Sequence, residues 1–266
     1  MVKDSIVDSS KPNPGRIYDY VLGGGHNFEV DRIAAEELKK LTPFVHKYAR
    51  LQRWSLKMIA EELTLKRGYD VIIDFASGLP TNDHLHFQVS PETTVIYSDI
   101  DPVTVQYAQE ILEGTPNART FESDAGYPDM LLSNPEVQEI LKGRRKVAFV
   151  LWGVSSFLSD DAIKNAAQVL YDWAAPGSCL AFNSQTMLPD HPLLGPTLDI
   201  YKRMGVTLYA RRPEDHLALL EPWRIDGDGF TPLLKWHGFE ESEFVSDDYR
   251  EFGPTGGGHG AYFMKP

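Results

Sequence analysis

The sequence predicts an α/β fold with a doubly wound, mostly parallel seven-stranded sheet. Short β-rich apolar runs begin at Val71 and alternate with stretches of helical periodicity. The runs are continuously apolar rather than alternately apolar and polar, which is typical of parallel strands covered on both faces. Before residue 69 only the helical period is present. We therefore expect one α/β unit over residues 69–266, preceded by a helical segment.

Residues 1–68 are expected to form a helical lid or arm outside the sheet. The polar stretch up to about Gly15, which holds two prolines, is interpreted as a loose arm. Apolar residues then recur at helical spacing at positions 30, 34, 38 and 41, and again at positions 56, 59, 60 and 63. Pro43 separates the two expected helices, and Gly68 ends the second.

Seven strands are expected from the apolar runs. The five parallel strands lie at residues 71–75, 94–97, 118–121, 147–152 and 178–182. Helices are expected near residues 103–111, 128–141, 159–173, 198–204 and 214–220. A sixth strand starts at residues 223–225, and a last strand over residues 261–264 is expected to be antiparallel, at or near the sheet edge.

Composition argues against nucleic acid and membranes as partners. The chain has 266 residues and a formal net charge of -12 at pH 7, so its surface repels phosphate backbones and anionic lipids. No apolar stretch is long enough to span a bilayer, and the N-terminus lacks the apolar core of a signal peptide. The single cysteine, Cys179, lies in an apolar run and cannot form an internal disulfide. We expect a cytoplasmic protein.

The turn after the first strand, D-F-A-S-G-L-P over residues 74–80, is an expected ligand site. It follows a parallel strand, and open α/β sheets bind ligands at the carboxyl ends of their strands. The small side chains of Ala76, Ser77 and Gly78 let the backbone approach a ligand closely. Neither a G-x-G-x-x-G dinucleotide motif nor a P-loop is present, so a ligand that needs no phosphate cradle is favoured.

Two carboxylates follow the second and third strands. Asp99, 25 residues after Asp74 and so one β-α-β step along, can accept hydrogen bonds from both hydroxyls of a ribose. Asp124, beside Ala125 and Gly126, is placed to bind an adenine amino group. Because strand-end aspartates also cap helices, the order and spacing of the set, rather than either residue alone, favour a nucleoside ligand.

Three stretches resemble motifs of class I S-adenosylmethionine (SAM)-dependent methyltransferases. The D-x-A-x-G run from Asp74 resembles their first motif, which usually has glycine at the position of Ala76. Residues 148–158 resemble the motif of their fourth strand, and residues 175–178 resemble the turn before the fifth. Trp152 in the fourth-strand motif is interpreted either as the floor of the pocket or as part of the core.

The N-terminal segment resembles one branch more specifically. Residues 14–28, P-G-R-I-Y-D-Y-V-L-G-G-G-H-N-F, followed by Asp31-Arg32, are similar to the R-x-Y-D-Y-x-L-G-G-x-x-N-F segment of the S-adenosyl methyltransferase family. This family is common in actinobacteria and was formerly catalogued as a domain of unknown function. The G-L-P-T run of residues 78–81 and the D-x-D-P run of residues 99–102 also match, so the resemblance spans nearly the whole chain.

The resemblance implies a class I methyltransferase-like Rossmann fold with SAM as the cofactor. The residues that it implies for cofactor binding are Arg16, Tyr20, Gly23, Asn27, Asp74, Ala76, Ser77, Gly78, Thr81, Asp99, Ile100, Asp124, Ala125, Trp152 and Gly153. This chain departs from the family pattern at Ala76, where the added methyl group should be tolerated. It also has Gly25-His26 in place of a basic–acidic pair, which points to a different substrate if that position contacts the acceptor.

The N-terminal motif has a second interpretation. Residues 23–25 are either a flexible turn or the hinge of a lid that closes over the cofactor. Arg16 and Asn27 alternatively pin the lid through backbone hydrogen bonds, and His26 is alternatively a surface residue. Asn183, at the end of the fifth strand, either contacts the methyl acceptor or caps the next turn.

Methyl transfer from a sulfonium is an in-line displacement, so the protein mainly aligns the reactants in a dry site. A general base is needed only when the acceptor carries a proton that must be removed, and His26, His86 and Tyr18 are the candidates. His84 and His86 lie on different sides of a helix, and no Asp/Asn cluster suggests magnesium, so no metal is expected.

The leading hypothesis is a methyltransferase for a small-molecule acceptor. One alternative keeps the reaction but changes the acceptor to a protein or a nucleic acid. Another is a SAM-binding sensor or scaffold without methyl transfer, because no base is evident. A lid-covered pocket favours the first hypothesis, whereas a wide-open or plugged acceptor face favours the last. The oligomeric state is not predicted.

Overall fold

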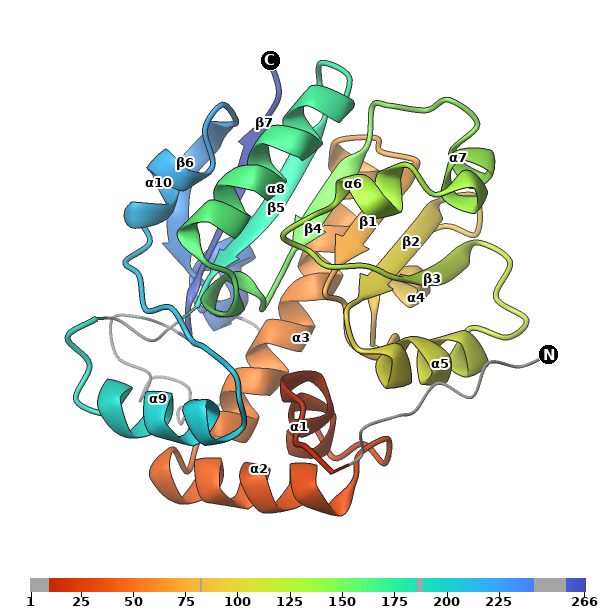
Figure 1. Ribbon diagram of the computed structural model, residues 1–266. Coiled ribbons are helices and arrows are strands. Elements are labelled where there is room, and N and C mark those ends of the chain that lie inside the picture. Colours follow the sequence, from red (N-terminus) through yellow and green to blue (C-terminus); the bar gives the residue numbers. More distant parts are fainter. Residues whose placement is uncertain (1–9, 82, 186–188, 242–256) are drawn as a thin grey trace.

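A seven-stranded sheet forms the centre of the computed structural model, with helices on both of its faces (Figure 1). The structure describes residues 10–81, 83–185, 189–241 and 257–266. The strands follow the order β3-β2-β1-β4-β5-β7-β6. Their bounds are β1 Val71–Phe75, β2 Thr94–Asp99, β3 Ala118–Glu122, β4 Ala148–Leu151, β5 Cys179–Ser184, β6 Arg224–Pro232 and β7 His259–Met264. The predicted doubly wound, mostly parallel α/β sheet is confirmed.

The chain starts the sheet at its centre and winds outward in both directions. β1 pairs in parallel with β2 on one side and with β4 on the other, and β3 and β5 continue each half in parallel. The strand order therefore reverses between β1 and β4, which is where an open α/β sheet binds its ligand. β7 runs antiparallel between β5 and β6, so it lies next to the edge strand, in agreement with its expected place.

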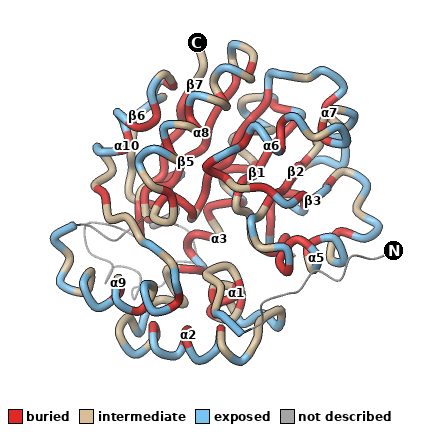
Figure 2. The backbone as a smooth tube through the Cα atoms, in the orientation of Figure 1, coloured by how far each residue is buried: buried red, intermediate tan, exposed pale blue. Residues whose placement is uncertain are grey.

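Some of the helices cover the sheet in two layers, and the others pack against one another beside it. They are α1 Pro14–Val21, α2 Glu29–Leu41, α3 Val45–Glu61, α4 Leu85–Gln88, α5 Pro102–Ile111, α6 Asp129–Leu132, α7 Pro135–Leu141, α8 Asp160–Trp173, α9 Leu194–Arg203 and α10 Asp215–Leu219, with short helical turns η1 Glu62–Lys66, η2 Ser155–Phe157 and η3 Trp236–Glu241. Apolar side chains of α6, α7, α8 and α10 pack on one face, and those of α3, α4 and η3 pack on the other. Every residue of β1, β4 and β5 is buried as a result (Figure 2), which explains the continuous apolar runs.

The single helix predicted over residues 128–141 is wrong, because the structure has two helices there. α6 ends at Leu132 and α7 starts at Pro135. A proline disfavours the helical conformation of the residue before it, and Asn134 is extended, with φ -60° and ψ 126°. The Asn134 side chain instead caps α7 by accepting the Glu136 N–H at 2.9 Å.

α1 has no counterpart among the predicted elements. The prolines near residue 12 suggest a loose arm, yet Pro14 occupies the start of α1, where its fixed φ and missing N–H favour a helix. Asn13 caps the helix, because its Oδ1 accepts the Gly15 N–H at 2.8 Å.

The N-terminal helices pack on one another and on a helix from the α/β part. α1, α2, the start of α3 and α9 share an apolar cluster, and α2 lies beside α9 at the bottom of Figure 1. The later residues of α3 belong instead to the cluster that covers the sheet. α3 therefore joins the N-terminal helices to the sheet, and the assignment of residues 1–68 as a lid stays a prediction.

Candidate cofactor and acceptor site

The turn after β1 folds back onto the end of β2. The Ser77 N–H donates to the Ser98 carbonyl at 2.9 Å, and the Gly78 N–H donates to Asp99 Oδ2 at 3.0 Å. Both Ala76 and Gly78 have positive φ, at 53° and 63°. Glycine adopts such angles without steric cost, whereas a residue with a Cβ loses about 1–2 kcal/mol. Ala76 is therefore accommodated with strain, which gives a physical reason for glycine in the motif that it resembles.

Asp99 presents a carboxylate at the carboxyl end of β2. Its Oδ1 accepts the Asp101 N–H at 2.9 Å, and its Oδ2 accepts the Gly78 N–H. Burial raises the pKa of this carboxyl to about 6, although its backbone hydrogen bonds act in the opposite direction. Each carboxylate oxygen has a second lone pair, so both oxygens can accept a further hydrogen bond. The next side chain, Ile100, is 60% exposed and offers an apolar surface.

Asp74 and His84 are buried beneath the turn. His84 Nδ1 accepts the Leu85 N–H at 2.9 Å, so the ring proton lies on Nε2, which faces the Ser77 carbonyl at 3.2 Å. Burial lowers the pKa of His84 well below its ordinary value and raises that of Asp74. Asp74 Oδ2 lies 3.8 Å from His84 Nε2, and Asp74 is only 2% exposed. Asp74 thus supports the turn from below, and its contact with the cofactor stays a prediction.

Arg53 of α3 holds the far end of the same turn. One of its terminal nitrogens, Nη2, donates to the Leu79 carbonyl at 2.8 Å and to Thr81 Oγ1 at 2.9 Å. Its Nε lies 3.1 Å from Asp83 Oδ1. Sequence reasoning missed this residue, because an arginine on an amphipathic helix is ordinarily assigned to the solvent side. Only the docking of α3 on the sheet buries Arg53 against the turn.

Asp19 of α1 organises the glycine-rich loop that follows this helix. Its Oδ2 accepts both the His26 N–H and the Asn27 side-chain N–H at 2.9 Å. A Cβ on Gly24 would lie 2.0 Å from Asp19 Oδ1, so a larger residue here would displace the Asp19 carboxylate. Gly23 has a φ of +89°. Asp19 lies inside the N-terminal motif but was not among the predicted site residues, because its role depends on the path of the loop.

Arg16 joins three segments of the chain. Its Nε donates to Asp31 of α2 at 2.9 Å, and its Nη1 donates to Asp101 at 3.0 Å. Its Nη2 donates to the Lys11 carbonyl at 2.8 Å. Asp101 also caps α5 by accepting the Thr104 backbone N–H at 3.3 Å, and it accepts the Thr104 hydroxyl proton at 2.9 Å. Every guanidinium nitrogen is engaged, two of them by carboxylates and only one by the backbone. The role of Arg16 in pinning a lid stays a prediction.

The sheet order brings the predicted residues to one edge. Along the carboxyl ends of neighbouring strands lie Asp124 after β3, Asp99 on β2, Ala76 after β1, Gly153 after β4 and Asn183 on β5. The first three residues follow the half of the sheet that starts at β1 and ends at β3. The other two follow the opposite half, and the switch point lies between the halves.

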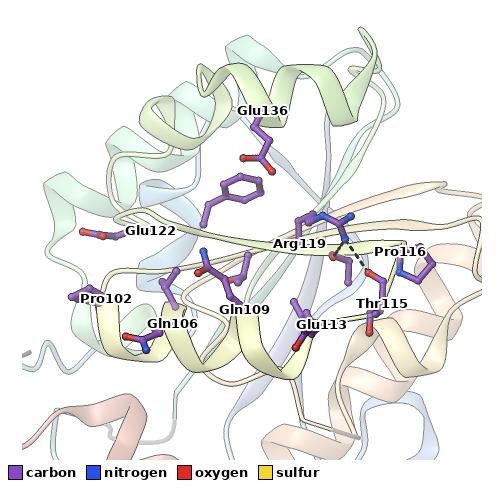
Figure 3. A pocket seen from close by; sticks show the side chains of 15 residues that line it. Pro102, Gln106, Gln109, Glu113, Thr115, Pro116, Arg119, Glu122 and Glu136 are labelled. Carbon is purple, nitrogen blue, oxygen red and sulfur yellow. Dashed lines mark hydrogen bonds between the residues drawn. The ribbon is translucent and has the colours of Figure 1, made fainter. Parts of the chain in front are cut away.

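A groove of about 920 Å³ lies elsewhere, along the outer side of the edge strand β3 (Figure 3). Residues of α5 and β3 line it, together with Glu136 of α7. Within it, Arg119 Nη1 donates to the Thr115 and Ala118 carbonyls. None of the predicted cofactor residues lines this groove. We therefore place the candidate site at the carboxyl-end turns and not in the groove.

Comparison with known proteins identifies the family. Residues 2–257 match the family model described as S-adenosyl methyltransferase. The chain belongs to the S-adenosyl methyltransferase family. It is therefore a SAM-dependent methyltransferase, and SAM is its cofactor. No curated protein matches the chain significantly.

Two solved structures resemble this methyltransferase over almost its whole length. A Thermobifida fusca protein named as a candidate methyltransferase has a TM-score of 0.85 at 28% identity, covering 100% of this chain and 99% of that chain. A DUF574-family protein of Streptomyces avermitilis has a TM-score of 0.84 at 25% identity, covering 98% and 100%. Human N-acetylserotonin methyltransferase in complex with SAM has a TM-score of 0.53 at 15% identity, covering 95% and 63%. The last likeness shows the shared fold alone.

The turns after β1, β2 and β3 fit the nucleoside half of SAM. Asp99 has lone pairs for two ribose hydroxyls, and the exposed Ile100 side chain suits an adenine face. Asp124 keeps its orientation because its Oδ1 accepts the Gly126 N–H at 2.8 Å, and Ala125 beside it is 5% exposed. When bound, SAM supplies an electrophilic methyl group. The individual contacts of these residues with SAM stay predictions.

Two of the three candidate bases have their polar atoms engaged elsewhere. The Tyr18 hydroxyl donates to the Ala49 carbonyl at 2.8 Å, and burial raises the pKa of Tyr18, so formation of a tyrosinate is opposed. His86 Nδ1 lies 2.9 Å from the Tyr97 hydroxyl, and burial lowers the pKa of His86 to about 4. Both assignments remain untested, and the geometry weighs against them.

His26, the third candidate, lies on the glycine-rich loop. Its ring packs edge-on against Tyr107 of α5, with 4.9 Å between the ring centroids. α5 begins directly after the Asp99 turn, so this contact places the loop beside the proposed nucleoside site. The contact lies on the nucleoside half of the sheet, and the role of His26 as a base stays a prediction.

Two predicted cofactor residues face other parts of the protein. The Tyr20 hydroxyl donates to Glu36 of α2 at 3.0 Å. Trp152 is 7% exposed, stacks on Trp236 with 5.0 Å between ring centroids, and donates its indole N–H to the Gln52 carbonyl at 3.1 Å. These contacts support the interpretation of Trp152 as a core residue. Contact of Tyr20 or Trp152 with the cofactor stays a prediction.

Within the described ranges, no three His, Cys, Asp or Glu side chains are arranged to hold a metal ion. The expected absence of a metal stays a prediction. No helix in the part of the chain that the structure describes is long and apolar enough to cross a membrane.

SAM binding is expected to weaken below about pH 6. The raised pKa of Asp99 means that its carboxyl is ionised above this pH and gains a proton below it, which removes an acceptor for a ribose hydroxyl. Affinity for S-adenosylhomocysteine, measured by calorimetry between pH 5 and 8, should fall by about tenfold per pH unit below 6. Asp99→Asn cannot titrate and should bind weakly with no such slope. The same slope in Asp99→Asn would contradict the assignment.

Arg53→Ala is expected to loosen the cofactor turn. The substitution leaves the buried Leu79 carbonyl without its charged donor, which should lower the free energy of unfolding by about 2 kcal/mol and weaken SAM binding. Thermal unfolding and calorimetry with S-adenosylhomocysteine measure the two effects. Arg50→Ala, an exposed position on the same helix, is the control and should change neither quantity. Equal behaviour of the two variants would show that Arg53 does not support the turn.

Proposed function

We propose that this methyltransferase methylates a small molecule in a site covered by its N-terminal helices. The observation that carries the proposal is the attachment of these helices to the carboxyl-end turns. Arg16 of α1 binds Asp101 directly after β2, and His26 of the glycine-rich loop packs on Tyr107. A covered site favours an acceptor that can be enclosed over a polymer that must enter from outside.

The charge of the chain supports the same choice. A net charge of -12 repels the phosphate backbone of nucleic acids, so a nucleic-acid acceptor is disfavoured. Membership of a methyltransferase family favours catalysis over a purely sensing or scaffolding role. No feature of the described residues favours a protein acceptor. The test below would detect methylation of protein as a separate outcome.

The protein's part in the reaction is mainly to position the reactants. The Ala76–Gly78 turn and Asp99 form the rigid wall against which the cofactor is held, since each is fixed by backbone hydrogen bonds. His26 is the remaining candidate to take a proton from an acceptor that carries one. The apolar core behind Trp152 helps to exclude water from that end of the sheet.

Labelled methyl transfer tests the proposal. The protein is incubated with SAM that carries a radiolabelled methyl group and, separately, with the low-molecular-mass and macromolecular fractions of a cell extract. We expect labelled small-molecule products that are resolved from SAM in the low-molecular-mass fraction. Asp99→Ala should lose cofactor binding and form no such product above background. Label in protein or nucleic acid alone would overturn the small-molecule proposal while leaving the methyltransferase activity in place.

A further inference from the structure

Two buried side-chain oxygens lack partners at the carboxyl end of β5. Gln52 of α3 is 2% exposed, and Asn183 of β5 is fully buried. Among the residues that the structure describes, neither Gln52 Oε1 nor Asn183 Oδ1 has a hydrogen-bond partner. Folded proteins rarely leave such atoms unsatisfied, because removing an acceptor from water without replacing its hydrogen bond is unfavourable. Two such atoms on neighbouring amides suggest a partner that is supplied by a ligand.

The orientation of both amides follows from their donors. Gln52 Nε2 donates to the Gly257 carbonyl at 3.1 Å, and Asn183 Nδ2 donates to the His259 carbonyl at 3.1 Å. Turning either amide over would set an oxygen against a carbonyl oxygen. The oxygens are therefore the free atoms, and the site offers two hydrogen-bond acceptors.

Gly258 shows that the two amides lie side by side. A Cβ at this residue would lie 3.2 Å from Gln52 Nε2 and 3.4 Å from Asn183 Nδ2, so the two amide nitrogens lie near the same point. The Ser184 carbonyl lies 3.1 Å from that point, and the φ of Gly258 is +111°. Glycine is required here both by conformation and by space, and its absent side chain lets the two amides converge.

The amide pair lies on the half of the sheet that the nucleoside residues leave free. In the strand register, Phe75 pairs with Leu151, and Leu151 pairs with Phe182. Asn183 therefore stands at the same carboxyl edge as the Ala76 turn, two strands away. Asp99 and Asp124 belong to the opposite half, beyond β1. This division leaves the β4–β5 side for the methyl acceptor.

We propose that Gln52 and Asn183 bind an uncharged O–H or N–H group of the methyl acceptor. The inference rests on the proposed small-molecule function and names the chemistry that its acceptor must carry. Two amide oxygens suit a neutral donor, because neither carries a negative charge to compensate a buried ammonium. The stacked rings of Trp152 and Trp236 beside Gln52 make the surroundings apolar, which strengthens a hydrogen bond made there.

Fragment binding tests the inference. Protein saturated with S-adenosylhomocysteine is titrated with phenol, and with fluorobenzene as a ring of similar size that has no donor, and followed by ligand-observed NMR. Phenol should bind more tightly than fluorobenzene. Gln52→Met and Asn183→Leu, which remove the free oxygens, should weaken phenol binding by about tenfold and leave fluorobenzene unchanged.

Controls separate recognition from folding. Affinity for S-adenosylhomocysteine should remain within about twofold of the wild type in both variants, and Gln138→Met on α7 should leave phenol binding unchanged. If Asn183→Leu does not fold, the test rests on phenol binding by Gln52→Met. Equal binding of phenol and fluorobenzene by the wild type, or phenol binding unchanged in a folded variant, would overturn the inference and assign the oxygens to trapped water.

Labelled methyl transfer distinguishes the two possible failures. If methyl transfer to the low-molecular-mass fraction has the same rate in the wild type and in Gln52→Met, this inference is contradicted but the proposed function is not. Label confined to macromolecules would contradict the proposed small-molecule function, whatever the phenol titration shows. Transfer to small molecules that falls about tenfold in Gln52→Met, with unchanged cofactor affinity, would support both.

Discussion

The docking of α3 on the sheet is the interaction on which both halves of the site depend. Its apolar side chains belong to the cluster that covers one face of the sheet, and its first turns join the cluster of the N-terminal helices. From this fixed position, Arg53 holds the turn after β1, and Gln52 reaches the end of β5. A shift of the helix along its axis would move both contacts together, so the turn after β1 and the end of β5 share one mechanical support.

The N-terminal motif acts through buried polar contacts. Arg16 links α1 to Asp31 and Asp101, and Asp19 orders the loop that carries His26. Buried charges are costly unless each has partners, so such contacts select one arrangement of these segments strongly. Asp101 also caps α5, which starts beside the Asp99 turn. The N-terminal motif thus positions the glycine-rich loop. Most of its polar side chains are already hydrogen-bonded within the protein.

Two departures from the family pattern have different structural consequences. At Ala76 the backbone has a positive φ, so the methyl group strains the turn without blocking it. At Gly25-His26 the backbone N–H of His26 is held by Asp19, and the ring turns toward Tyr107. The first change alters the energy of a fixed turn, and the second alters which side chain the loop presents. The second would bear on the choice of acceptor if this position contacts it, which stays a prediction.

Local patterns in the sequence determined the sheet, its mainly parallel direction and the turns after β1, β2 and β3, because apolar periodicity and strand-end residues act over a few positions. They also marked Asp99 and Asn183 as strand-end polar residues. They did not show the break at Asn134-Pro135 correctly, nor the helix that starts at Pro14, since proline both ends and begins helices. Tertiary structure alone decided the roles of Arg53, Asp19 and Gln52. Arg53 and Gln52 contact residues far along the chain, and Asp19 contacts a loop whose path the sequence does not show. Their polar groups become buried only because α1 and α3 pack as they do.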